Sequence, residues 1–520
     1  MNRMRDAYIV LAAGTLLLTA LALHGAQQYD LKNLVLIMST AVAGTPIPFK
    51  AYKALRMKTL SIELLITIAV VGALIIGEYV ESAVVTFLFV FGAWLQARTL
   101  EKTRSAMQKL IASEPLRATV IRADGNVSIA VENIAIGDRI AIHRGEKVTV
   151  DGPIVLGLAL IDESAITGVT ESVRKSVNNV VYSGTFLESG YVEVIARCTS
   201  ADTTSSKMIA MLEDAQETGT KTHWFLERFA TAYTPSVVAL SLLVYVFTGD
   251  IHMALTFLVI ACPGALVIAG PVSLAAGLGN GARHGILIKD GETVENLAKV
   301  DVVLFTKAGI LTTDSQGPAE ARTDTQIAID QVRSAGISKL YLLTEDSVET
   351  GRAMARAYGL DGVYAELSPE RKVEQVTELI AQGHKVAIIG NGVHDAPALA
   401  AANVGVALGA ANSIVSMGTA DVVLLSNRLG QFSYAYLLAR STLRNMKQNT
   451  YFAMATVVLL LFGVLLGSVF LASGMLIHEL SVLIVILNAV RLTCYRNPHH
   501  PDLAMIYASR KKAAQATQDI

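Results

Sequence analysis

The sequence predicts a polytopic α-helical membrane protein with about eight transmembrane helices and two water-soluble inserts. Hydrophobic residues make up 52% of the 520 residues and charged residues only 17%, with a mean hydropathy of +0.47. Soluble proteins usually have about 25% charged residues. Apolar runs that suit a hydrocarbon core of about 30 Å recur in pairs. Between the pairs lie two stretches with the alternating patterns of soluble domains.

The apolar runs that predict membrane spans fall at eight places along the chain. They are residues 8–25, 33–48, 60–78, 80–97, 230–249, 252–274, 450–472 and 474–495. The first run follows Arg3 and Arg5 and has the charge pattern of a signal peptide. Because further spans follow closely, we interpret it as an uncleaved anchor.

Basic residues flank the predicted spans on one side of the membrane. They are Arg3, Arg5, Lys50, Lys53, Arg56, Lys58, Arg491 and Arg496. The positive-inside rule makes this side cytoplasmic and places both termini inside. In residues 44–58, "GTPIPFKAYKALRMK", glycine and prolines break a helix before a basic amphipathic segment begins. We expect that segment to lie at the inner interface.

The two inserts have different patterns. Residues 98–229 contain short apolar bursts such as "DRIAIHR" between Gly and Asp-Gly turns, which predicts a small β-rich domain. Residues 280–445 alternate strand patterns such as "KVAIIG" with helical stretches, which predicts a doubly wound, Rossmann-type α/β domain. The remaining predicted domains are four spans at 1–97, a span pair at 230–279, a span pair at 446–496 and a polar cytoplasmic tail at 497–520.

Charge and cysteine content exclude several classes of function. The 43 Lys and Arg residues balance 44 Asp and Glu residues, so nothing indicates a nucleic-acid partner. The cysteines, Cys198, Cys262 and Cys494, lie far apart and form no Cys-x-x-Cys pair. We therefore expect neither a disulfide framework nor a thiolate-rich metal-binding appendage. The expected partners are the lipid bilayer and a ligand within it.

The order of these segments resembles the heavy-metal-transporting branch of the P-type ATPases over nearly the whole chain. The segments that resemble the actuator domain are "GDRIAIHRGEKVTVDG" and "IDESAITG", and "ACPGAL" resembles the Cys-Pro motif of the ion-binding helix. The phosphorylation domain is matched by "HGILIKDGETVENLAKVD" and "GNGVHDAPALAAANVGVALG", and the last helix by "IHELSVLIVILNAVRL". The resemblance implies an actuator-like domain at 98–229 and a HAD-like phosphorylation domain at 280–445.

The phosphorylation motif departs from the family pattern. The family's DKTGTLT reads "TKAGILT", so Thr306 stands at the position of the nucleophilic Asp, and Lys307 is retained. The family's GDGxND reads "GNGVHD", in which Asn391 and His394 are substitutions and Asp395 is retained. An unactivated hydroxyl is a weak nucleophile, and Mg²⁺ prefers carboxylate ligands.

Two further motifs also differ. The phosphate-sensing TGD reads "TED", which keeps Thr344 and places Glu345 at the glycine, while Lys372 in "SPERK" matches the phosphate-neutralising lysine. In the actuator, the TGE loop reads "TGVTES", so Val169 stands where the hydrolytic Glu belongs. Valine cannot activate water, and Glu171 would need a two-residue change of register to replace it.

The family's nucleotide-binding domain has no counterpart of sufficient length. Residues 313–342 leave about thirty residues for it, whereas an ordinary domain has about 50–250. Together these departures predict a pseudo-ATPase that is not an enzyme, with no ATP hydrolysis, no autophosphorylation and no bound ATP or Mg²⁺.

A candidate ligand site remains within the membrane, at Cys262-Pro263. Proline frees a backbone carbonyl and unwinds the helix locally, and a thiolate is a soft-metal ligand. A buried cysteine can also act as a small hydrophobe, but the family resemblance favours a ligand. Since Gly264 replaces the family's second cysteine, other ligands are needed.

Ionisable residues in the last span are the best additional ligands. His478 and Glu479 in "LIHELSV" are functional candidates because burying such groups is costly, unless they face solvent near the start of the helix. Glu78 and Glu81 in "GEYVES" resemble the family's path carboxylates, with a solvated turn as the alternative. His252, before Cys262, is typical of the membrane interface.

The metal itself is not readable from the sequence. Thr456 and Val457 replace residues that distinguish copper from zinc pumps in the family, and Ala93 and Gln96 replace glutamates at which ions enter its path. A Cys-Pro dipeptide also suits haem iron, so a transition metal and haem both remain open.

The predicted function is that of a pseudo-ATPase in a bacterial inner membrane. It would bind or passively move a soft or transition metal, or a metal complex, at Cys262, His478 and Glu479. Two alternatives remain: an active heavy-metal-translocating ATPase with a substituted mechanism, and an accessory or regulatory subunit with a protein partner.

Overall fold

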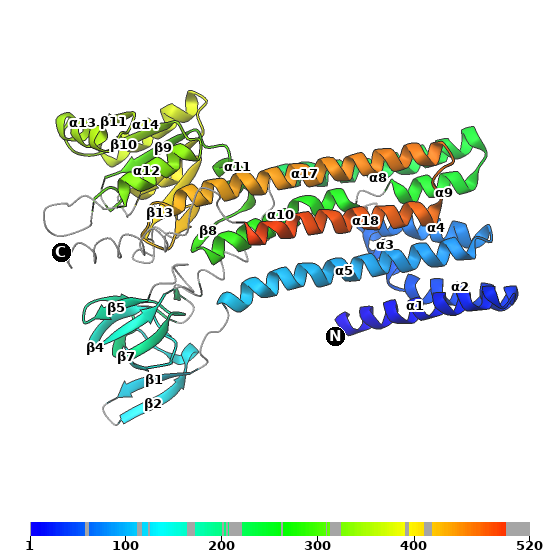
Figure 1. Ribbon diagram of the computed structural model, residues 1–520, viewed down its shortest axis with the longest axis horizontal. Coiled ribbons are helices and arrows are strands. Elements are labelled where there is room, and N and C mark those ends of the chain that lie inside the picture. Colours follow the sequence, from blue (N-terminus) through cyan, green and yellow to red (C-terminus); the bar gives the residue numbers. More distant parts are fainter. Residues whose placement is uncertain are drawn as a thin grey trace, which may run out of the picture. The chain divides into compact units, whose positions relative to one another are not determined.

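The computed structural model of the chain divides into two compact units (Figure 1). The first unit comprises Met1–Gln108, Gln216–Ala276 and Arg444–Val490, and the second comprises Lys109–Ala215, Gly277–Leu443 and Arg491–Ile520. The residues that the structure describes are 2–57, 62–111, 117–122, 125–163, 172–199, 202–203, 206, 221–261, 264–307, 309–312, 324–390, 395–409 and 419–495.

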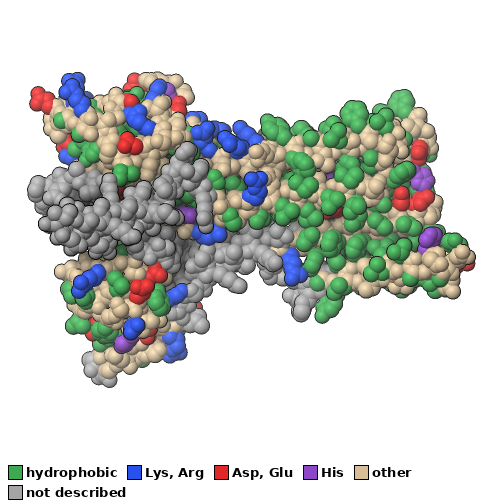
Figure 2. Space-filling view, in the orientation of Figure 1, with side chains coloured by type: hydrophobic (Ala, Val, Ile, Leu, Met, Phe, Trp, Pro, Cys, Tyr) green, Lys and Arg blue, Asp and Glu red, His purple; other side chains and the backbone are tan. Residues whose placement is uncertain are grey.

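The first unit is built from long helices, some of which continue into the second. They are α1 (Asn2–Gly25), α2 (Tyr29–Gly44), α3 (Pro46–Arg56), α4 (Ile62–Ile75), α5 (Tyr79–Ile111), α8 (Lys221–Thr248), α9 (Ile251–Ile260), α10 (Gly264–Arg283), α17 (Gln431–Leu465) and α18 (Leu471–Val490). Hydrophobic side chains cover most of the visible face of these helices, as expected for contact with lipid (Figure 2).

The apolar helices agree with the predicted spans. Among the described residues, the stretches long and apolar enough to cross a membrane are Ala7–Gly25, Ile251–Arg283, Gln431–Leu465 and Leu471–Cys494. A bent pair, α2 with α3, passes the same test together, and three shorter apolar helices are Glu63–Ile75, Tyr79–Leu95 and Tyr233–Thr248. These segments match the eight predicted places, so the predicted polytopic helical class is confirmed.

The predicted helix break near residue 45 is present. The axes of α2 and α3 differ by 46°. Pro46 begins α3, a position where the missing N–H of proline costs no helical hydrogen bond. The basic residues Lys50, Lys53 and Arg56 all fall within α3, which supports its prediction as an amphipathic segment.

Buried polar side chains join three helices of the first unit. Asn449 of α17 donates to Ser273 of α10 (3.1 Å) and to the carbonyl of Val485 in α18 (3.3 Å). Asn488 of α18 donates to Asn449 Oδ1 at 2.8 Å, and Asn445 donates to the Asn488 carbonyl at 3.0 Å. Because polar groups in hydrocarbon need partners, this network holds the three helices in one register.

In the second unit, the β-rich domain forms a largely antiparallel sheet in the order β2-β1-β3-β7-β4-β5, with β6 also paired to β4. Its strands are β1 (Arg117–Arg122), β2 (Gly125–Ala130), β3 (Arg139–His143), β4 (Gly152–Asp162), β5 (Val173–Ser176), β6 (Val180–Val181) and β7 (Phe186–Ile195). Residues alternate between buried and exposed along β4, and the buried ones, such as Ile154 and Ile161, form the core with Leu187.

The α/β domain has a sheet in the order β11-β10-β9-β12-β13-β14-β8, parallel except for β8. Its strands are β8 (Ile286–Ile288), β9 (Val302–Thr306), β10 (Lys339–Leu343), β11 (Gly362–Tyr364), β12 (Val386–Gly390), β13 (Val404–Leu408) and β14 (Val422–Leu424). Its helices are α11 (Gly291–Leu297), α12 (Thr325–Ser334), α13 (Val348–Ala357), α14 (Pro369–Ala381) and α15 (Ala396–Ala401). Helices cover the sheet, and every residue of its central strands β9 and β12 is buried (Figure 1).

The strand order reverses between β9 and β12. From β9 the chain winds outward through β10 and β11, and from β12 it winds the other way through β13 and β14. In doubly wound sheets, ligands bind beyond the carboxyl ends of the strands at such a switch point. The carboxyl ends of β9 and β12, at Thr306 and Gly390, are therefore where a site is expected.

Candidate functional site

Thr306 ends β9 at this switch point. Thr306 is 2% exposed, and its hydroxyl has no hydrogen-bond partner among the described residues. It pairs in register with Leu343 of β10, so Thr344 lies just beyond the same edge. A buried hydroxyl without a partner is costly, which indicates a group reserved for something other than stability.

Lys372 lies beside two carboxylates at the same edge. Its ammonium donates to Asp395 Oδ1 at 3.0 Å and to Glu345 Oε1 at 3.1 Å. Ser368 and Pro369 begin α14 and place Lys372 on its buried face. Burial alone would lower the pKa of Lys372, but Asp395 and Glu345 outweigh burial and raise it. Lys372 is therefore fully charged.

A second lysine pairs with a third carboxylate. Lys307, directly after β9, lies 2.7 Å from Asp346 Oδ2. The backbone N–H of Asp346 donates to Thr344 Oγ1 at 3.1 Å. Asp395 lies against the end of β12, since a Cβ at Gly390 would meet the Asp395 side chain at 3.0 Å. The structure thus brings the retained residues Lys307, Thr344, Lys372 and Asp395 to one edge, beside Thr306.

Several predicted positions lie outside the described residues. They are Val169, Glu171, Cys262, Asn391 and His394. Their chemical identity is fixed by the sequence, and their roles stay predictions.

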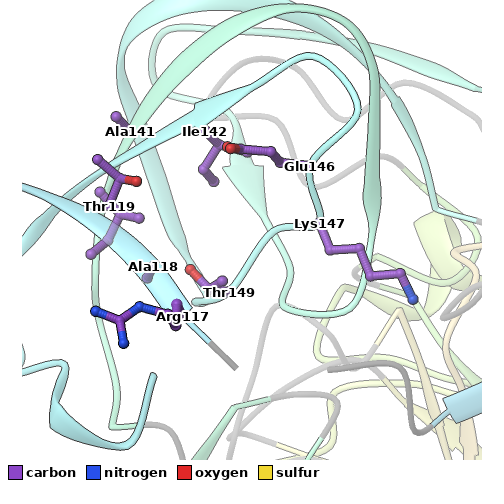
Figure 3. Close-up of a pocket in the computed structure, with 9 residues that line it drawn as sticks. Arg117, Ala118, Thr119, Ala141, Ile142, Glu146, Lys147 and Thr149 are labelled. Carbon is purple, nitrogen blue, oxygen red and sulfur yellow. The ribbon is translucent and has the colours of Figure 1, made fainter. Parts of the chain in front are cut away.

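The β-rich domain contains a cavity of about 230 Å³ (Figure 3). Arg117, Thr119, Glu146, Lys147 and Thr149 contribute its polar lining. Arg117 is bound to Ser128, and Glu146 accepts from the backbone N–H of His143 at 2.8 Å. In Figure 3 the Lys147 side chain extends away from Glu146. These groups do not converge on a common point, so the cavity offers no catalytic arrangement.

His478 is buried in the membrane unit. His478 is 3% exposed, and its Nδ1 atom has no hydrogen-bond partner among the described residues. It lies seven residues after the start of α18, so it does not face solvent at the helix end. An imidazole nitrogen without a hydrogen-bond partner in an apolar interior is a candidate metal ligand.

The face of α18 that carries His478 packs against the described ends of α9 and α10. One turn before His478, a Cβ at Gly474 would collide with Ile260, the last residue of α9. One turn after it, Val482 belongs to the same apolar cluster as Ala265 in the first turn of α10. Since residues four apart share a helix face, His478 lies on the same face of α18 as Gly474 and Val482.

Glu479 lies against α5. A Cβ at Gly92 would coincide with the Glu479 carboxylate, so the glycine leaves the space that this side chain occupies. The sequence did not single out Gly92; a small residue in an otherwise bulky apolar span was its only signal.

Glu78 and Glu81 lie near His252. Glu78 precedes α5, Glu81 lies in its first turn, and His252 lies within electrostatic range of Glu81. His252 is in the first turn of α9, so these groups gather where helices begin. Among the described residues, no three His, Cys, Asp or Glu side chains form a metal-binding cluster.

Comparison with known families matches both soluble domains. The profile of the P-type ATPase actuator domain matches residues 112–213, and that of the haloacid dehalogenase-like hydrolases matches residues 190–403. The predicted actuator-like and HAD-like folds are therefore confirmed.

Similarity to known proteins extends over nearly the whole chain. A probable cadmium-transporting ATPase of Listeria monocytogenes is 26% identical, over 90% of this chain and 84% of its own length. The zinc-transporting ATPase of Bacillus subtilis is 28% identical, over 93% of this chain and 94% of its own length. The crystal structure of a zinc-transporting PIB-type ATPase in the E2.Pi state superposes with a TM-score of 0.54 and 25% identity, covering 94% of this chain and all of that one.

These relatives contradict the predicted loss of activity. They are named as transporting ATPases, so the prediction of a pseudo-ATPase that is not an enzyme is wrong. That prediction rested on the combined replacement of the motif residues and on the short stretch at 313–342. The fold places Glu345, Asp346 and Asp395 around the same edge, so replacing the carboxylate at Thr306 leaves the edge rich in carboxylates. The haem alternative gains no support from relatives named for cadmium and zinc.

Proposed function

Because the chain belongs to the P-type ATPase family, we propose that it is an active ATPase that translocates a heavy-metal ion by a substituted mechanism. The observation that carries the proposal is the similarity to cadmium- and zinc-transporting ATPases over nearly the full length of both chains. The protein would lie in the bacterial inner membrane with both termini in the cytoplasm, as the positive-inside rule predicts.

The proposed cargo is a soft divalent ion such as Zn²⁺ or Cd²⁺. Its ligands would be the Cys262 thiolate, the His478 imidazole and the Glu479 carboxylate, a set that suits Zn²⁺. The unpartnered Nδ1 of His478 supports this assignment. One turn before His478, Gly474 packs on Ile260, which precedes Cys262 by two residues in the sequence.

The proposed phosphoryl acceptor is Thr306. Lys372 and Thr344 would bind the phosphate, and Asp395 and Asp346 offer the carboxylates that Mg²⁺ prefers. When bound, Mg²⁺ supplies neutralisation of the phosphate charge. The Thr306 hydroxyl occupies the position of the family's nucleophile and is free of hydrogen bonds among the described residues. The absence of a nucleotide-binding insert at 313–342 stays a prediction.

The proposal is tested with the full-length protein in proteoliposomes. We expect Zn²⁺ or Cd²⁺ to stimulate ATP hydrolysis and ion movement, and Thr306→Ala to abolish both. Thr377→Ala, on the exposed face of α14, is the matched control. A threonine phosphoester survives hydroxylamine, whereas an acyl phosphate on Asp346 is cleaved by it. Absence of hydrolysis by the wild-type protein with either metal would overturn the proposal.

A further inference from the structure

A groove on the lipid-facing side of the first unit is lined by α1, α2 and α5. We propose that it binds a phospholipid with an anionic headgroup, with one acyl chain in the groove and the phosphate beside Lys32. This site is separate from the metal path and from the phosphorylation edge, so the proposal goes beyond the proposed function.

The groove is large and apolar. Its volume is about 780 Å³, and its walls include Leu11, Leu18, Leu21, Leu36, Phe87 and Phe91. Leu11, Leu18 and Leu21 are 64–68% exposed, so they project from α1 as one wall. Gly14 forms part of the floor, since a Cβ there would meet the Phe87 ring at 3.3 Å. A larger residue at this position would fill the space between α1 and α5.

The length of the groove suits one acyl chain. At 1.5 Å per residue, α1 from Leu11 to His24 is about 20 Å long. One leaflet of the hydrocarbon core is about 15 Å thick.

The polar end of the groove carries positive charge. Lys32 and His24 line the same end, on either side of the α1–α2 connection. Tyr29 orders both, with Lys32 Nζ 5.5 Å from its ring centroid and the His24 ring 5.9 Å from it. In the described part of the chain, no carboxylate forms an ion pair with Lys32. An unneutralised lysine at the headgroup level of an apolar groove complements a lipid phosphate.

Lipid retention by the purified full-length protein in mild detergent tests the proposal. Native mass spectrometry would compare phosphatidylglycerol with phosphatidylcholine of identical acyl chains. We expect the wild type to retain phosphatidylglycerol preferentially, and Lys32→Gln to weaken that binding about fivefold. Lys50→Gln, in α3 and outside the groove lining, is the charge control and should behave as wild type.

A second variant fills the groove. Gly14→Leu should lower retention of both lipids, whereas Gly25→Leu, which has open space around its Cβ position, should not. Thermal stability measured in parallel separates misfolding from lost binding. Equal retention of the two lipids by the wild type would overturn the proposal. So would a dimeric mass that Gly14→Leu converts to a monomer, because a second copy would then occupy the groove.

Discussion

The ammonium of Lys372 lies 3.0 Å from Asp395 Oδ1, and both residues are buried near the end of β12. Glu345 approaches the same ammonium from the exposed side, where its side chain is 61% exposed. The two ion pairs therefore differ in energy. Removing one member of a buried pair leaves an uncompensated charge, whereas an exposed pair contributes little.

This difference predicts unequal effects of two substitutions. Asp395→Ala should destabilise the domain by about 3 kcal/mol, because Lys372 would keep only its exposed partner. Glu345→Gly, which installs the residue that the family has there, should change stability by less than about 1 kcal/mol. Thermal unfolding of the full-length protein in detergent measures both. Equal losses of stability would show that burial does not separate the two pairs.

At the opposite edge of the sheet, the interactions of Asp301 predict that the stability of the domain depends on pH. Burial would raise the pKa of Asp301, but hydrogen bonds from His384 (3.0 Å) and from the Lys385 N–H (2.7 Å) outweigh it and lower the pKa below 3.8. The stabilisation is present above pH 3.8, the ordinary value, and is lost as pH falls through the folded-state pKa. Since the Asp301 side chain is half-exposed, this stabilisation of the folded state amounts to less than about 1 kcal/mol.

Asp301→Asn tests this assignment. The variant should unfold at a lower temperature than wild type at pH 6, and the difference should shrink as the pH falls below 3.8. Asp330→Asn, at an exposed position of α12 where Asp330 accepts from Gln326, is the control. A difference that stays constant through the acid range would contradict the assignment.

Periodicity and helix punctuation were sufficient to predict the fold. The apolar runs gave the helices, and "VDVVLF" and "KVAIIG" became the adjacent strands β9 and β12. The site was harder to predict because its groups come from distant segments. Lys372 and Asp395 meet Glu345 only after the sheet forms, and Glu345 carried no functional signal except as a replaced glycine. The space that Gly92 leaves for Glu479 is likewise a property of packing.

The polar network between α10, α17 and α18 predicts a stability effect. Asn449→Leu should remove the hydrogen bonds that Asn449 makes with Ser273, with Asn488 and with the carbonyl of Val485. Such interhelical hydrogen bonds are each worth about 0.6 kcal/mol, so losing three of them should cost about 1–2 kcal/mol. Thr456→Val is the control on α17, because the Thr456 hydroxyl donates to the carbonyl of Phe452 in its own helix. Thermal unfolding in detergent checks both, and equal effects would argue against a role in joining helices.

The contact between Gly92 and Glu479 predicts an effect on metal handling. An added methyl group in Gly92→Ala would displace the Glu479 carboxylate, because the Cβ position is already occupied by it. If Glu479 is a metal ligand, the KM for Zn²⁺ in metal-stimulated hydrolysis should rise about tenfold or more, as for other changes that misplace metal ligands. Glu479→Gln should give the same phenotype.

The matched control for this substitution is Gly270→Ala in α10. Its added Cβ would meet only the terminal methyl of Met446, at 3.7 Å, which is ordinary van der Waals contact. Its KM for Zn²⁺ should equal that of the wild type. Combining Gly92→Ala with Glu479→Gln should add little to either single change, since both remove the same carboxylate from its place. Additive effects would show that Gly92 acts through another neighbour and that Glu479 is not positioned by it.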